Sequence, residues 1–143
     1  MVPESELFVN GVEPGDVIQG ALGDCWFLGP LSVIADKTEL LNKIFITTAI
    51  NDYGVYAFQF FKAGRWFPVI IDDFVPVDAK TGALVYAHCK DPTELWVPLV
   101  EKAYAKLHSC YEAIESGTET NAFLDLTACP PEERLVAVSI YSF

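Results

Sequence analysis

Residues 19–28 read Gln-Gly-Ala-Leu-Gly-Asp-Cys-Trp-Phe-Leu, and this stretch decides the fold. It places Cys25 directly after a Gly-Asp turn and directly before an apolar run that is long enough for a buried helix. A cysteine at a helix N-terminus faces unpaired backbone N–H groups and the positive end of the helix dipole, and both favour the nucleophilic thiolate. We therefore expect Cys25 to be a nucleophile at the head of a buried helix.

Gln19 precedes Cys25 by six residues, across a loop in which Gly20 and Gly23 let the chain fold back. The side-chain amide of Gln19 and the backbone N–H of Cys25 would then be two donors for an oxyanion, an arrangement suited to acyl transfer. The alternative is that Cys25 is a small buried hydrophobic residue, and such cysteines are unreactive. The residues alone leave both interpretations open.

Several further stretches, in a fixed order along the chain, resemble the calpain family of cysteine proteases. After residues 19–28 they are Phe58-Gln59-Phe60, the turn from Gly64 to Trp66, Ile71-Asp72-Asp73, Glu94-Leu95-Trp96, Glu101–Lys106 and Cys110–Ala113. The resemblance runs from about Gly11 to Thr127. It implies the first, nucleophile-bearing lobe of a papain-like fold, in which the nucleophile heads the central helix. It also divides the chain into a protease lobe, residues 1–127, and a divergent C-terminal tail, residues 128–143.

Hydrophobic periodicity predicts helices and strands in segregated runs, which favours the α+β class. The predicted helices are Cys25–Ala35, Thr38–Lys43, Glu94–Ile114 and Thr120–Leu126. In the first of them Asp24 would be the N-cap, and Pro30 would cause a kink or loosen the first turns. The predicted strands are Ile44–Thr48, Val55–Lys62 and Trp66–Ile71, forming an antiparallel meander, and a short Leu84–Tyr86. Within the meander, Pro68 marks an edge strand or a bulge.

The composition is that of one domain with a substantial core: 143 residues, 52% hydrophobic, with ten Phe and three Trp. The formal net charge of −11 makes nucleic acid an unexpected partner, because phosphate binding needs clustered Lys and Arg. No secretory signal is visible at the N-terminus, so we expect a reduced, intracellular (cytoplasmic) protein whose four cysteines are free. No apolar run reaches transmembrane length.

The resemblance also implies residues that contact substrate. Trp26, beside the nucleophile, would form a wall of the cleft, and the alternative is that it packs beneath the sheet. Gly117 matches a glycine whose backbone pairs with substrate in the family, and the alternative is a helix C-cap.

A calcium site is implied in the same way, with Asp16 and Glu94 as carboxylate ligands and main-chain oxygens near Val9 and Gly11. Ca²⁺ takes several oxygen ligands, so the set is chemically suitable. We expect Asp72 and Asp73, by contrast, to be turn residues at a strand end and not ligands.

A thiol protease also needs a general base, and the sequence offers His88 and His108. His88 matches a family histidine outside the active site, and we expect His108 to be solvated. The family's catalytic His and Asn lie in a second lobe, in Gly-His-Ala-Tyr and Asn-Pro-Trp-Gly motifs, and neither motif occurs here. The sequence thus predicts the nucleophile-bearing lobe of a calcium-regulated cysteine endopeptidase, inactive alone, with a protein substrate and a second lobe or other protein as partners. The alternative is a non-catalytic interaction or scaffold module.

Overall fold

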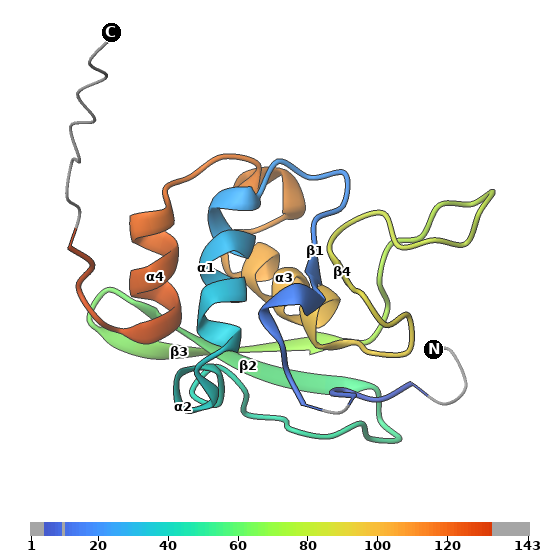
Figure 1. The fold of residues 1–143 in the computed structure, drawn as a ribbon, viewed down its shortest axis with the longest axis horizontal. Coiled ribbons are helices and arrows are strands. Elements are labelled where there is room, and N and C mark those ends of the chain that lie inside the picture. Colours follow the sequence, from blue (N-terminus) through green and yellow to red (C-terminus); the bar gives the residue numbers. More distant parts are fainter. Residues whose placement is uncertain (1–4, 10, 133–143) are drawn as a thin grey trace, which may run out of the picture.

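The computed structural model of the chain describes residues 5–9 and 11–132, and these form an α+β fold, as predicted (Figure 1). In chain order the elements are η1 (Pro14–Asp16), β1 (Val17–Ile18), α1 (Cys25–Ala35), α2 (Thr38–Leu41), β2 (Val55–Lys62), β3 (Arg65–Asp72), β4 (His88–Cys89), α3 (Trp96–Leu107), η2 (Tyr111–Ile114) and α4 (Glu119–Thr127). The predicted boundary at residue 128 stays a prediction, because most of the tail lies outside the described residues.

The two sheets are small and antiparallel. β2 and β3 form a hairpin in the register Val55 to Asp72, closed by a turn in which Ala63 and Gly64 both have positive φ. Such a two-residue turn matches the right-handed twist of the strands. β1 pairs with β4 in the second sheet, with Val17 opposite Cys89.

The prediction of a three-stranded meander is wrong, because the sheet has only the two strands β2 and β3 among the described residues. The segment Ile44–Thr48 is not a strand, and a single bridge joins its Phe45 to Phe58 of β2. The N–H groups of Ile46 and Thr47 both donate to the carbonyl of Ala57, each at 3.0 Å, so the regular ladder cannot continue.

The predicted strand at Leu84–Tyr86 is also displaced along the chain. Leu84 forms only a bridge with Val77, and the strand itself is β4, at His88–Cys89. The pattern therefore located the segment but not the residues that pair.

The core lies between the hairpin and the helices. Figure 1 shows α1 beside α4, with β2 and β3 beneath them, and α1 and α4 are in extensive contact. The buried face of β2 carries Tyr56, Phe58 and Phe60. Tyr104 of α3 stacks on Phe27 of α1 with 3.9 Å between ring centroids, and it meets Phe60 edge-on at 5.2 Å. This aromatic cluster fixes the first turn of α1 against the sheet.

The helix α1 begins and ends where the sequence predicts, at Cys25 and Ala35, and it continues through the buried Pro30. The predicted long helix, in contrast, is interrupted. α3 ends at Leu107, Ser109 has a φ of 95°, and the chain resumes as the short 3-10 helix η2. A residue in the left-handed region cannot continue a right-handed helix.

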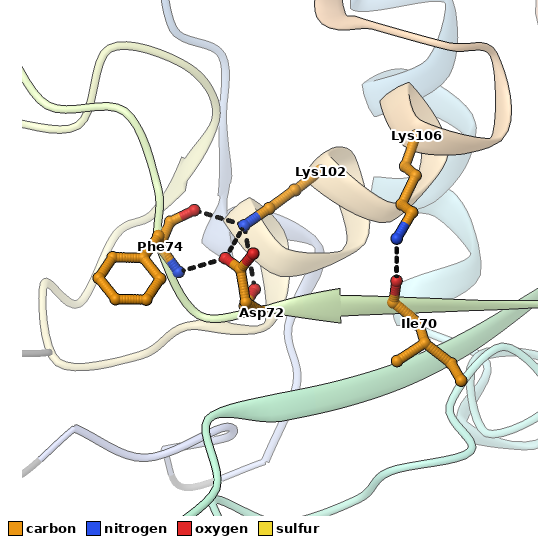
Figure 2. A network of polar contacts seen from close by, with 5 residues as sticks. All are labelled: Ile70, Asp72, Phe74, Lys102 and Lys106. Carbon is orange, nitrogen blue, oxygen red and sulfur yellow. Dashed lines mark hydrogen bonds and ion pairs between the residues drawn. The ribbon is translucent and has the colours of Figure 1, made fainter.

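Lysines from α3 cover the free edge of β3 (Figure 2). Lys106 Nζ donates to the carbonyl of Ile70 at 2.6 Å. Lys102 Nζ donates to the carbonyl of Asp72 at 3.1 Å, and it also bonds to the Asp72 carboxylate and to the carbonyl of Phe74. The ammonium group of Lys102 lowers the pKa of Asp72. These contacts satisfy carbonyls that an edge strand otherwise presents to other chains.

Only β2 pairs with β3 among the described strands, so the prediction that Pro68 marks an edge strand is confirmed. Asp72 ends that strand, as predicted. No described helix has the length and apolar character needed to cross a membrane. All four cysteines are free.

Candidate active site

Cys25 is the first residue of α1, and its side chain is exposed. The carbonyl of Asp24 accepts the N–H groups of Phe27 and Leu28, at 2.8 and 3.1 Å, which closes the first turn of the helix. The thiol therefore lies at the positive end of the helix dipole of α1. No hydrogen bond joins Cys25 Sγ to another described residue. The thiol is therefore free to contact another molecule.

Gln19 follows β1 directly and is exposed, and its Nε2 donates to the carbonyl of Leu22 at 2.7 Å. An amide nitrogen has two hydrogens, so one remains for a second acceptor. The backbone of this loop is held against the segment before β4. Ala21 donates to the carbonyl of Val85 at 2.9 Å. A Cβ on Gly20 would lie 2.3 Å from backbone atoms of Tyr86, so only glycine fits there.

Trp26 and Gly117 lie against each other beside the nucleophile. Trp26 is half-buried, and its Nε1 donates to the carbonyl of Ile114 at 2.9 Å. A Cβ on Gly117 would lie 2.4 Å from the Trp26 ring. The alternative reading of Gly117 as a helix C-cap is wrong, because the C-cap of η2 is Glu115. The structure thus brings together the two residues that were predicted to contact substrate.

A pair of buried carboxyl groups lies under the nucleophile, and the sequence reasoning missed it. Asp24 is the N-cap residue, as predicted, but its side chain makes no capping hydrogen bond and is 0% exposed. Glu101 of α3 is 1% exposed, and both of its carboxyl oxygens accept the N–H of Ala87 at 3.1 Å. The sequence does indicate that Glu101 is buried, because it lies four residues after Val97 and three before Tyr104, on one face of the predicted helix.

Burial raises the pKa of both carboxyl groups, and the charge of Asp24 raises that of Glu101 further. Burial also raises the pKa of Tyr111, which faces both acids from η2. A carboxyl with a raised pKa can be protonated at neutral pH, and then it can donate a hydrogen bond.

The four predicted calcium ligands line one cavity of about 440 Å³, at the N-terminal side of β1. Its lining residues are Val9, Gly11, Glu13, Asp16, Lys90, Asp91, Pro92 and Glu94. Glu94 accepts the N–H of Val9 at 3.0 Å, and Asp16 accepts the N–H of Glu13 at 2.7 Å. In the described part of the chain, no group of three or more His, Cys, Asp or Glu side chains is arranged to hold a metal ion.

The electrostatics of this cavity nevertheless suit a cation. Burial raises the pKa of Glu94, and the charges of Asp16 and Asp91 raise it further. A divalent ion would relieve that repulsion. Because side chains alone do not complete the set, main-chain oxygens of the neighbouring loop would have to contribute.

Comparison with known proteins gives a consistent result. The sequence profile described as "Calpain family cysteine protease" matches residues 1–137. The chain belongs to the calpain family. It is 43% identical over 127 residues to the calpain-type cysteine protease DEK1 of Arabidopsis thaliana, which covers 89% of this chain and 6% of that protein. It is 38% identical over 130 residues to the calpain-1 catalytic subunit of Gallus gallus (89% of this chain, 18% of that protein). Human calpain-2 catalytic subunit is 36% identical over 127 residues (87% of this chain, 18% of that protein). The chain therefore spans a small part of these relatives.

Neither histidine of this calpain-family chain is bonded to Cys25. His88, in β4, has Nδ1 3.2 Å from the carbonyl of Tyr86. His108 was expected to be solvated, and that expectation is wrong. It is half-buried and packs on Tyr104 with 4.6 Å between ring centroids, and burial lowers its pKa. A lowered pKa favours the neutral form that packs on an aromatic ring.

Proposed function

We propose that this chain is the nucleophile-bearing lobe of a papain-like, calpain-type cysteine endopeptidase that acts on protein substrates. The observation that carries the proposal is the exposed thiol of Cys25 at the N-terminus of α1. The loop that carries Gln19 precedes it in the chain, and Trp26, which packs against Gly117, follows it directly. In the proposed reaction the Cys25 thiolate attacks a peptide carbonyl, and the backbone N–H of Cys25 and the amide of Gln19 stabilise the oxyanion. The leaving amine takes a proton, and water then hydrolyses the thioester.

A general base must take the thiol proton and pass it to the amine, and a histidine from a second lobe would supply it. We therefore propose that the described lobe is inactive alone and binds that lobe across the face that carries Cys25. The alternative, a non-catalytic interaction module, is favoured by the bond between Gln19 and Leu22, because it occupies part of the oxyanion donor.

We further propose that Ca²⁺ binds where Asp16 and Glu94 meet. The ion would neutralise repulsion among carboxylates and join the loop before β1 to the start of α3. Because β1 leads directly into Gln19, an ordered loop would also fix the oxyanion donor. The intracellular location stays a prediction.

The thiol is tested by competitive alkylation at neutral pH with peptide mass mapping. Cys129 is the matched control, because it is exposed and follows the end of α4, whereas Cys110 is exposed but is the N-cap residue of η2. We expect Cys25 to react first and the buried Cys89, whose pKa is raised by burial, to react last. Faster labelling of Cys110 or Cys129 would remove the physical basis of the nucleophile assignment.

Activity is tested by peptide hydrolysis with and without calcium. We expect no turnover from this chain alone, and turnover only after a second lobe with a catalytic histidine is added. Hydrolysis by the chain alone that Cys25→Ser abolishes would contradict the proposed need for a second lobe. If the two lobes bind but never hydrolyse peptide, the interaction module is the better explanation.

A further inference from the structure

The two buried carboxyl groups, those of Asp24 and Glu101, differ in their hydrogen bonds, because the N–H of Ala87 donates to Glu101 alone. The carboxyl oxygens of Asp24 accept no hydrogen bond from an N–H or O–H group of the described residues, although they are fully buried. The carboxyl group of Glu101 lies within hydrogen-bonding reach of Asp24. Two carboxylates can only accept, so a bond between them requires one proton.

Within residues 5–9 and 11–132, no cationic side chain offsets two negative charges at this pair. No lysine, arginine or histidine among the described residues contributes to the electrostatics of either acid. The titratable group that faces both is the phenol of Tyr111, on which Tyr86 stacks with 4.1 Å between ring centroids. Two like charges in a buried site without a partner repel strongly, and binding one proton removes most of that repulsion.

The pair also joins the segments that form the site. Asp24 is bonded covalently to Cys25, and Glu101 holds the N–H of Ala87. Ala87 follows Tyr86, whose backbone packs against Gly20 next to Gln19. A displacement of Asp24 from Glu101 would therefore move the Cys25 turn relative to the Gln19 loop.

We propose that Asp24 and Glu101 share one proton, and that the resulting hydrogen bond makes Glu101 a positioning residue for the Cys25 nucleophile. This inference rests on the proposed function, since it concerns the thiol that would attack. The raised pKa of both acids is consistent with a proton that stays bound at neutral pH. When the proton leaves, repulsion separates the acids and the backbone N–H of Cys25 moves with Asp24.

Two variants of Glu101 separate the proton from the hydrogen bond. In Glu101→Gln, the side-chain oxygen can still accept the N–H of Ala87, while the amide donates to Asp24 at every pH. In Glu101→Leu, a side chain of similar size offers neither contact. Glu112→Gln is the matched control, because Glu112 is an exposed acid in η2.

The measurement is the alkylation rate of Cys25 by iodoacetamide from mildly acidic to alkaline pH, with the exposed Cys129 as internal reference. In the parent chain we expect two steps, one for the thiol and one for the carboxyl pair. Glu101→Gln should leave only the thiol step, and Glu112→Gln should keep both. In Glu101→Leu we expect the rate of Cys25 relative to Cys129 to fall about tenfold, which corresponds to about 1.4 kcal/mol, roughly one hydrogen bond to a charged group.

Infrared spectroscopy tests the proton directly. The parent chain at neutral pH should show the C=O band of a protonated carboxylic acid, and Glu101→Gln should lack it. A single-step profile in the parent, or two steps in Glu101→Gln, would overturn the inference even if Glu101→Leu does not fold. The proposed function fails separately, if Cys129 is alkylated faster than Cys25 in the parent chain.

Discussion

Replacing Gly117 by alanine tests whether the loop after η2 packs directly on the tryptophan beside the nucleophile. The new Cβ would lie 2.4 to 2.6 Å from three atoms of the Trp26 ring, well inside van der Waals contact. The backbone of Gly117 is not among the positive-φ residues, so alanine suffers no backbone strain there. Any destabilisation therefore reports the packing of this loop on Trp26 and not strain in the backbone of residue 117.

The expected loss follows from three terms. Forcing extra atoms into a packed site costs about 1–3 kcal/mol. If the ring moves, its bond to the carbonyl of Ile114 adds about 1 kcal/mol. Alanine in place of glycine restricts the unfolded chain and returns about 0.4–1 kcal/mol. We expect a net loss of about 1–3 kcal/mol, which lowers Tm by roughly 3 to 10 °C in a domain of this size.

The assay is urea unfolding followed by tryptophan fluorescence, with Gly29→Ala as the matched control. Gly29 lies inside α1, and a Cβ there would meet nothing within 4 Å. That variant should gain up to about 1 kcal/mol from helix propensity. If Gly117→Ala unfolds at the parent's urea concentration with an unchanged emission spectrum, the loop does not pack on Trp26 and the cleft wall is wrongly assigned.

Three further predictions concern the calcium cavity, the core and pH. Calcium should raise Tm, and Asp16→Asn and Glu94→Gln should each shrink the rise while leaving the calcium-free chain as stable as the parent; an undiminished rise in both variants would place the ion elsewhere. Tyr104→Phe removes the bond from its hydroxyl to the Asp125 carboxylate, 2.7 Å long, and should lower the free energy of unfolding by about 1–3 kcal/mol, read from the urea midpoint. Burial and the charge of Asp24 raise the pKa of Glu101 from 4.5 to about 8. Between these values the folded state holds a proton that the unfolded state releases, so the free energy of unfolding should fall as pH rises from about 4.5 to about 8. Glu101→Gln should flatten this fall in Tm against pH, and a parallel curve would contradict it.

Sequence patterns were sufficient where structure is local. The bounds of α1 follow from the turn before Cys25 and the apolar run after it, and the hairpin follows from alternation on either side of Ala63 and Gly64. The family resemblance also brought together Val9, Gly11, Asp16 and Glu94, which are far apart in the chain, and calcium binding there stays a prediction. These four residues do line one cavity.

Sequence patterns were insufficient where tertiary contacts determine where an element ends or whether a side chain is buried. Apolar residues at helical spacing form a stripe along the predicted long helix, and Leu107, Tyr111 and Ile114 continue it past Ser109. The backbone nevertheless turns at Ser109, and the spacing of apolar residues does not record that turn. His108 was expected in solvent because it lies off the stripe, but the break in the helix leaves it packed on Tyr104. Residues 44–48 have the composition of a strand. The N–H groups of Ile46 and Thr47 share the carbonyl of Ala57, however, and the segment forms only one bridge, between Phe45 and Phe58.

The nucleophile motif is contiguous in sequence, but residues much further along the chain hold its geometry. Gln19 and Cys25 belong to one short segment, and this closeness suggests that the segment forms the site by itself. Its loop nevertheless packs on the backbone of Tyr86, and its N-cap acid reaches Glu101 in α3. Substitutions at Glu101 should therefore change the reactivity of a thiol 76 positions earlier in the sequence without touching it. A search for determinants of this site should begin on the buried face of α3, where an acid among apolar residues is otherwise unexplained.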